Sequence, residues 1–304
     1  MSYADEIVKL SRRRFLRQCA ATAAAIPLTA PLLAHAAGQV AAPGQPYPFR
    51  LGLQSYSLRN FPLADALAKT KALGLTWWEG FPGHVPMTAD AAKIAAYRQL
   101  FTSHGVRMIS YGVLDFTDDE ADARSKFDFA KAMGIRTLTA APKPSALPLI
   151  DKLTQEYAIN IGIHNHGPDD NQWGDWEKIV AATKGLNPRV GACDDTGHYL
   201  RANKNPVTAA VEFGKHLHSV HLKAVAQGPN GTKVFVPIGA NGNLLDAVLL
   251  LRSLKDIGYR GILAIEEEEQ PDNPIPLITQ SVEAMRRYIA TVNTVTLKPG
   301  KEKA

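Results

Sequence analysis

Four short stretches in the second half of this 304-residue chain each end an apolar run with side chains that can bind a metal ion. Their polar ends hold His164, Asp195, His221 and Glu266, at roughly the spacing of one strand–helix unit. In a parallel β/α barrel the C-terminal strand ends face one common mouth, where active sites form. One such histidine alone is typical of a hydrogen-bonded core residue. Four strands that each end in such a residue, at the same position of successive strand–helix units, predict a metal-centred active site.

The expected ligands are a mixture of imidazole and carboxylate groups. Such a mixture suits Mn, Co, Fe or Zn, or Mg when more oxygen ligands are present. The sequence therefore predicts a divalent metal ion (Mn, Co, Mg or Zn) as cofactor, without deciding which of these it is.

Strand patterns and helix patterns alternate from residue 49 to the C-terminal region, and these elements must position the polar residues. Gly74, Gly105 and Gly134 follow helical patterns, as helix stops do. Eight alternations predict an α/β fold, a (β/α)8 TIM barrel, in a single domain over residues 48–292. A doubly wound open sheet is less favoured because no G-x-G-x-x-G follows the first strand. Strands are expected at residues 49–57, 75–79, 106–111, 135–140, 159–163, 189–194, 218–222 and 261–265, with a long Gly/Pro-rich loop over 225–243.

Both ends of the chain are expected to lie outside the fold. Residues 1–36 read as a twin-arginine signal peptide, with SRRRFL at 11–16, an apolar run at 19–33 and the cleavage pattern AHA at 34–36. This predicts a periplasmic protein, and the apolar run is too short and alanine-rich for a stable membrane anchor. Residues 37–47 form a Pro/Gly-rich linker, and residues 293–304 are a basic tail expected to be disordered.

The composition narrows the class of protein. Residues 1–36 contain five basic and two acidic residues, so removing them lowers the formal charge from +5 to +2 and leaves no case for nucleic-acid binding. One cysteine, Cys193, then remains, which excludes an intrachain disulfide. Its place in an apolar strand favours a small core residue over a nucleophile.

Between about residues 49 and 289 the chain resembles the xylose isomerase-like barrel superfamily. The motifs that carry the resemblance are Asp195-Thr-Gly-His198, His221-Leu-Lys223, the sequence VPIGANGN at 236–243, and Glu266. That group contains sugar isomerases and epimerases, 2-keto-myo-inositol dehydratases, 3-keto-glycoside lyases and relatives of endonuclease IV. The resemblance implies that Asp195, His221 and Glu266 are metal ligands.

The fourth ligand position departs from the epimerase pattern. Where the epimerases have a Glu-Asn-His string, this chain has His164-Asn165-His166. Epimerisation next to a carbonyl can use two carboxylates on opposite faces, whereas a single base suffices for β-elimination. We therefore favour a metal-dependent lyase acting on a 3-keto-glycoside or related keto-polyol. A sugar isomerase or epimerase is the alternative, followed by a non-catalytic sugar-binding barrel and, least, a DNA-repair endonuclease.

The expected roles cover two groups of residues. His164 (as ligand or as base), His166, Glu266 (preferred over Glu268) and Lys223 are the expected catalytic residues. Because polar and aromatic side chains suit a sugar's edge and face, further strand-end residues are expected to bind the carbohydrate substrate. These are Gln54, Glu79, His84, Lys143 and His198. A homo-oligomer is compatible with the sequence.

Overall fold

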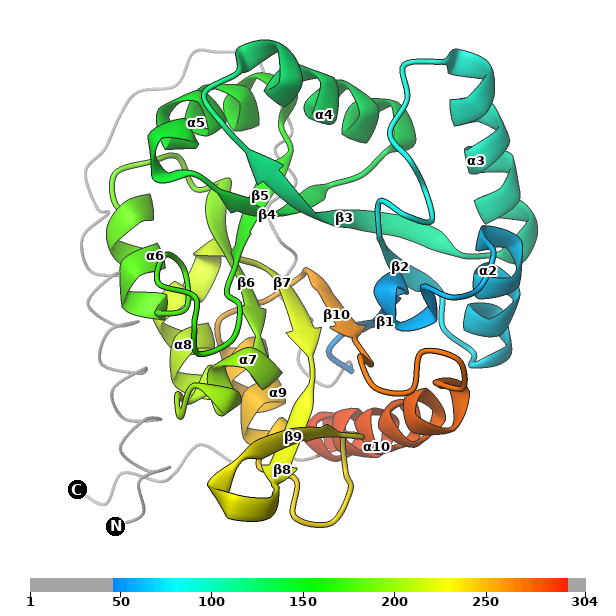
Figure 1. Ribbon diagram of the computed structural model, residues 1–304, viewed down its shortest axis with the longest axis vertical. Coiled ribbons are helices and arrows are strands. Elements are labelled where there is room, and N and C mark those ends of the chain that lie inside the picture. Colours follow the sequence, from blue (N-terminus) through cyan, green and yellow to red (C-terminus); the bar gives the residue numbers. More distant parts are fainter. Residues whose placement is uncertain (1–45, 295–304) are drawn as a thin grey trace, which may run out of the picture. The chain divides into compact units, whose positions relative to one another are not determined.

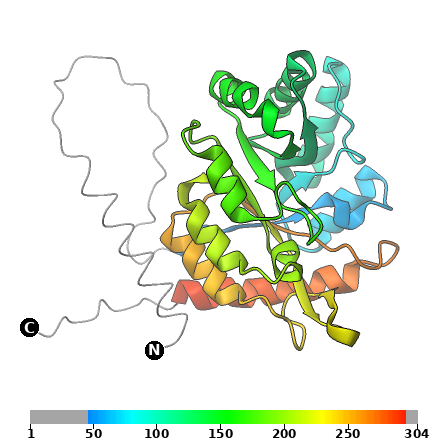
Figure 2. The same cartoon turned by 60° about the vertical axis from the view of Figure 1, so that its left-hand side comes forward.

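A computed structural model describes residues 46–294, in which eight parallel strands close into a barrel surrounded by helices (Figures 1 and 2). Around the barrel the strands follow the order β1-β10-β7-β6-β5-β4-β3-β2. The predicted single-domain TIM barrel is confirmed. Its strands are β1 (Arg50–Gln54), β2 (Trp77–Gly80), β3 (Arg107–Phe116), β4 (Thr137–Pro142), β5 (Asn160–His164), β6 (Val190–Asp195), β7 (Leu217–Leu222) and β10 (Ile262–Ile265).

The helices that cover the barrel begin and end where local chemistry requires it. Asp90 and Asp119 cap the two longest early helices, because each carboxylate accepts hydrogen bonds from two backbone amides of the first turn. Gly105 and Gly134 end the same helices in the left-handed conformation, with φ of 67° and 74°. The helices are α2 (Leu63–Ala72), α3 (Ala91–His104), α4 (Glu120–Met133), α5 (Leu147–Tyr157), α6 (Trp176–Thr183), α7 (Thr196–Arg201), α8 (Pro206–Phe213), α9 (Ala247–Asp256) and α10 (Ile275–Thr294).

Strand register brings the polar strand ends together. Asp195 on β6 pairs with His221 on β7, and His221 is level with Ala264 on β10. His164 on β5 is level with Cys193 on β6. Residues far apart in the sequence therefore lie side by side at one end of the barrel.

Three features of the fold differ from the predicted elements. Residues 224–236 form an antiparallel hairpin of β8 (Ala224–Gln227) and β9 (Lys233–Val236) within the predicted loop. The turn at Pro229–Gly231 holds Asn230 at φ 56°, and each flanking strand contains three consecutive apolar residues. The short helix α7 follows β6 directly, since the Asp195 side chain caps it. The first strand ends at Gln54, and residues 55–57, predicted as strand, belong to a 3-10 helix (Ser55–Leu58).

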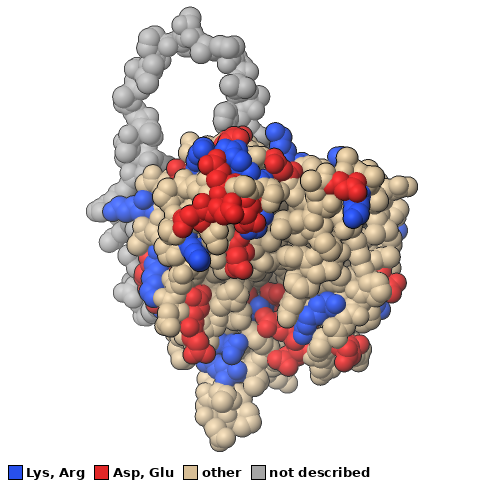
Figure 3. Space-filling model, turned by 45° about the horizontal axis from the view of Figure 1, so that its top comes forward, with Lys and Arg blue, Asp and Glu red and all other residues tan. Residues whose placement is uncertain are grey.

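Some predictions concern residues that the structure does not describe. The predicted signal peptide, most of the linker and most of the basic tail lie outside residues 46–294. Within the described residues no helix is both long and apolar enough to cross a membrane. On the face shown in Figure 3, acidic and basic side chains are interspersed.

Candidate metal centre

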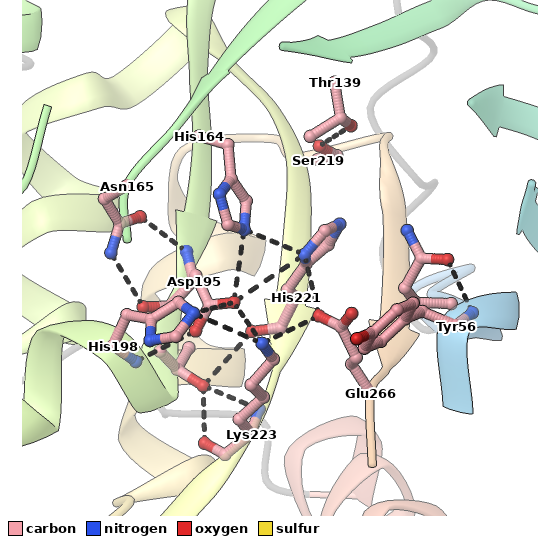
Figure 4. Close-up of polar contacts among 12 residues, drawn as sticks. Tyr56, Thr139, His164, Asn165, Asp195, His198, Ser219, His221, Lys223 and Glu266 are labelled. Atoms are coloured by element: carbon pink, nitrogen blue, oxygen red, sulfur yellow. Dashed lines mark hydrogen bonds and ion pairs between the residues drawn. The ribbon is translucent and has the colours of Figure 1, made fainter. Parts of the chain in front are cut away.

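The predicted ligand residues meet at the C-terminal end of the barrel (Figure 4). His164 Nε2 lies 3.3 Å from Asp195 Oδ2 and 3.1 Å from His221 Nδ1. His221 Nδ1 lies 3.1 Å from Glu266 Oε2 and 3.7 Å from Asp195 Oδ2. All four side chains are nearly inaccessible to solvent. Two nitrogen and two oxygen atoms thus converge on one buried point.

Both spacing and charge fit a divalent ion at that point. Atoms bound to one ion at about 2.0–2.2 Å are separated by roughly 3–3.6 Å. The distances of 3.1, 3.1 and 3.3 Å lie in this range, and the distance of 3.7 Å lies just above it. Glu79, Asp195 and Glu266 bring three buried carboxylates, while Lys223 is the buried ammonium group among them. Two positive charges on an ion would balance this excess of negative charge.

The buried carboxylate of Glu79 orients the His221 ring. Its Nε2 lies 2.7 Å from Glu79 Oε1, and both side chains are fully buried. Gln54 Nε2 donates to the same Glu79 oxygen over 2.9 Å. Because Nε2 then carries the hydrogen that faces Glu79, Nδ1 of a neutral His221 has a free lone pair directed at the centre.

The backbone of Asp195 is held by Asn165, the residue that directly follows β5. Asn165 Nδ2 donates to the Asp195 carbonyl over 3.1 Å, and the Asp195 amide donates to Asn165 Oδ1 over 2.8 Å. The His198 amide occupies Asp195 Oδ1 at 2.9 Å. The other carboxylate oxygen, Oδ2, is thereby left to face His164 and Lys223.

The protonation states of His164, Asp195 and Glu266 favour metal binding, whereas His221 would have to release a proton to the solvent. Burial lowers the pKa of His221, but Cys193, Glu79 and Glu266 raise it well above its usual value. Burial lowers the pKa of His164 to about 3, so its imidazole is neutral and keeps a lone pair at neutral pH. Burial raises the pKa of Asp195, but His198 and Lys223 together hold it well below its usual range. Burial likewise raises the pKa of Glu266, and the charges of Lys223 and His221 lower it by more. Both carboxylates are therefore ionised.

Lys223 forms a fixed positive charge beside the predicted ligands. Its Nζ lies 3.0 Å from Asp195 Oδ2 and 2.9 Å from Glu266 Oε2, and it also pairs with Glu268. Burial lowers the pKa of Lys223, but the three carboxylates, led by Asp195, raise it well above its usual value. Its backbone amide is held by Thr196 Oγ1 at 2.9 Å. This ammonium group can stabilise negative charge but cannot accept a proton.

The imidazoles of His166 and His198 and the aromatic ring of Phe235 lie close to the predicted ligands. The exposed His166 ring has its centroid 4.5 Å from that of His164 and 5.6 Å from that of His198. Phe235, on the unpredicted hairpin, lies 6.0 Å from the His198 ring and 5.6 Å from Lys223 Nζ. The hairpin therefore supplies an apolar wall beside the polar floor, as a sugar site requires.

The predicted substrate-binding residues are distributed differently from our expectation. Gln54 and Glu79 are buried against His221 instead of lying exposed at the rim. His84 Nε2 contacts the backbone carbonyls of Leu58 and Phe61, where it holds a loop. Besides Glu79, His198 of this group lies beside a predicted ligand, with its Nε2 3.9 Å from Asp195 Oδ2. The fifth, Lys143, is exposed just after β4.

Several residues of the site were not singled out from the sequence. Cys193 lies within 4.8 Å of ligand atoms of His164 and His221, and burial raises the pKa of its thiol. Its position two residues before Asp195 on the same strand could have revealed this, since such residues share a face. Asn165 and Thr196 are adjacent to predicted ligands, but no sequence pattern indicates their hydrogen bonds.

Comparison with known proteins gives one family match. Residues 67–288 match the family described as xylose isomerase-like TIM barrel. The rhizopine catabolism protein MocC of Rhizobium meliloti is 23% identical over 218 residues, 66% of this chain and 64% of that protein. A mannonate dehydratase of Oceanobacillus iheyensis is 27% identical over 122 residues, 36% of this chain and 33% of that enzyme. These matches thus span less than two thirds of either relative.

A solved structure shows the same fold. IolI protein, crystallised with a zinc atom, superposes with a TM-score of 0.62 at 17% sequence identity. The superposition covers 81% of this chain and the whole of that chain.

Proposed function

This chain belongs to the xylose isomerase-like TIM barrel family, and from that premise we propose that it is a divalent-metal-dependent enzyme that removes a proton next to a sugar carbonyl. Within that class we propose a lyase that eliminates the aglycone from a 3-keto-glycoside or a related keto-polyol. The observation that carries the proposal is the convergence of His164, Asp195, His221 and Glu266 on one buried point beneath the open barrel end.

The four converging side chains would hold the ion. The structure of IolI protein, which has the same fold and was crystallised with a zinc atom, supports the proposed ion. The name of the related mannonate dehydratase, an enzyme that eliminates water, agrees with the proposed elimination. A bound divalent ion would polarise the carbonyl oxygen of the substrate and so acidify the adjacent C–H bond.

His166 is the proposed base. Its ring is exposed at the mouth beside the buried His164, so it can reach a substrate that His164 cannot. Imidazole is a competent general base at neutral pH. His164, buried and directed at the other ligand atoms, is assigned to the metal.

The proposed reaction needs no second carboxylate base. His166 takes the proton from C2 of a 3-keto-glycoside, and the C–H electron pair forms the C1=C2 double bond. The C1–O bond breaks, and the leaving oxygen takes up a proton to give the free alcohol. The ammonium group of Lys223 is placed to stabilise negative charge on the sugar oxygens.

We also propose that the enzyme acts in the periplasm on unphosphorylated carbohydrates. The support is the twin-arginine pattern at residues 11–16.

The test is aglycone release by the Mn²⁺-loaded protein from a chromogenic 3-keto-glucoside. His166→Ala should lower the rate about 10²- to 10⁴-fold while leaving metal content unchanged. Deuterium at C2 should slow release in the wild type. The control is His104→Ala, because His104 ends α3 and hydrogen-bonds to its own helix. Epimer formation from free ketohexoses without aglycone release would overturn the elimination.

A further inference from the structure

A second cavity lies at the opposite end of the barrel from the metal centre. It encloses about 320 Å³ and is lined by Arg50, Trp77, Arg98, Arg107 and Arg136, with an apolar wall that includes Phe101. Arg50, Trp77 and Arg107 are the first residues of β1, β2 and β3, and Arg136 directly precedes β4. These four strands are neighbours in the barrel, so their N-terminal ends place the four residues along one edge.

The charge in this cavity is not balanced by the described part of the protein. No acidic residue is among those that line the cavity. Arg98, Arg107 and Arg136 are exposed at this cavity, and within residues 46–294 their guanidinium groups have no hydrogen bond or ion pair. Arg50 donates a hydrogen bond to the backbone carbonyl of Arg260. A carbonyl group is neutral, so this hydrogen bond does not neutralise the charge of Arg50. Burial and the neighbouring Arg136 both lower the pKa of Arg50, as expected where positive charges crowd together.

Trp77 helps to hold two of these groups in place. Its ring lies 5.5 Å from the guanidinium carbon of Arg50 and 5.9 Å from that of Arg107. Contact with the face of an aromatic ring stabilises a guanidinium group and reduces its mobility. Guanidinium groups so arranged bind the paired oxygens of phosphate or carboxylate through two parallel hydrogen bonds.

We propose that this cavity binds a small oxyanion with at least two negative charges, a phosphate or a dicarboxylate. A multivalent anion matches a cavity lined by four arginines and no acidic residue, whereas a singly charged anion would leave most of this positive charge unbalanced. The size of the cavity suits a small molecule, and its apolar wall can contact a short carbon chain. The site is separate from the metal centre and does not depend on the proposed reaction.

The test is isothermal titration of the full protein with phosphate, succinate, acetate and chloride at constant ionic strength. Phosphate or succinate should bind at least tenfold more tightly than acetate or chloride, and the tighter of the two identifies the kind of anion. The double variant Arg107→Ala/Arg136→Ala should weaken that binding at least tenfold. Equal binding of all four anions would overturn the proposal.

Two further variants separate anion recognition from general charge and folding. Arg252→Ala/Arg287→Ala removes the same charge from exposed positions of α9 and α10 and should leave binding unchanged. Arg107→Lys/Arg136→Lys retains the charge and the fold but loses the paired donors, so it should weaken binding severalfold. A loss in the α9/α10 variant equal to that in the cavity variant would show non-specific attraction and overturn the site.

Discussion

Changing Glu79 to glutamine tests whether the buried Glu79 carboxylate strengthens metal binding by orienting His221. The substitution preserves the shape of the side chain and removes its negative charge. The contact at stake joins Glu79 Oε1 to His221 Nε2 over 2.7 Å, between two fully buried side chains. Without the charge, His221 loses the partner that fixes its tautomer and raises the basicity of Nδ1.

The expected loss can be bounded from this geometry. Changing a carboxylate that orients a ligand histidine typically costs 10- to 100-fold in metal affinity, or about 1.4–2.7 kcal/mol. The loss of metal affinity should lie in this range, because Gln54 can still hydrogen-bond to the side chain at position 79 although the negative charge is lost. The four ligand side chains themselves are unchanged.

The assay is competition for Co²⁺ or Zn²⁺ between the protein and a chromophoric chelator. The matched control is Asp194→Asn, since Asp194 is equally buried but adjoins Asp195 on the alternate face of β6. Its affinity should stay within about twofold of the wild type. The reasoning would be refuted by a Glu79→Gln protein that binds metal as tightly as the wild type, or by an equal loss in the control.

Three further outcomes are expected. Burial lowers the pKa of His218 to about 4 from 6.5, so stability is full above pH 6.5 and falls as the pH drops towards 4. Between pH 7 and pH 5 the wild type should lose about 2 kcal/mol more than His218→Gln in urea unfolding, and equal losses would contradict this. Gly197→Ala would place a Cβ 2.5 Å from Lys223 Cβ, so urea unfolding should show a loss of about 1–3 kcal/mol; unchanged stability would refute the close packing. Asn165→Ala removes both hydrogen bonds to the Asp195 backbone, which should cost about 2–3 kcal/mol in the same assay, and a loss below 1 kcal/mol would count against this role of Asn165.

The barrel was predictable because its strands repeat one pattern. Buried runs alternate with helical patterns along the chain, and register then brings Asp195 and His221 together. The hairpin was not predictable, because residues 225–243 are rich in Gly and Pro and only the four-residue strands β8 and β9 form within them. Short strands of this kind depend on pairing that the local sequence does not display.

The site was predictable only in part for a related physical reason. Strand-end position reveals which residues meet, but not how deep each one lies. From the sequence, Glu79 was therefore expected to lie at the rim of the barrel, although its side chain is buried against His221. The hydrogen bonds of Asn165 depend on the exact alignment of two strands, which a sequence pattern does not specify.

The most direct test of the metal centre is an anomalous-diffraction map from crystals grown with Mn²⁺ or Zn²⁺. We predict one strong peak at the C-terminal end of the barrel, about 2.0–2.2 Å from His164 Nε2 and His221 Nδ1 and bound by Asp195 and Glu266. A peak elsewhere, or an ion bound without His164, would contradict the assignment of that histidine as the fourth ligand.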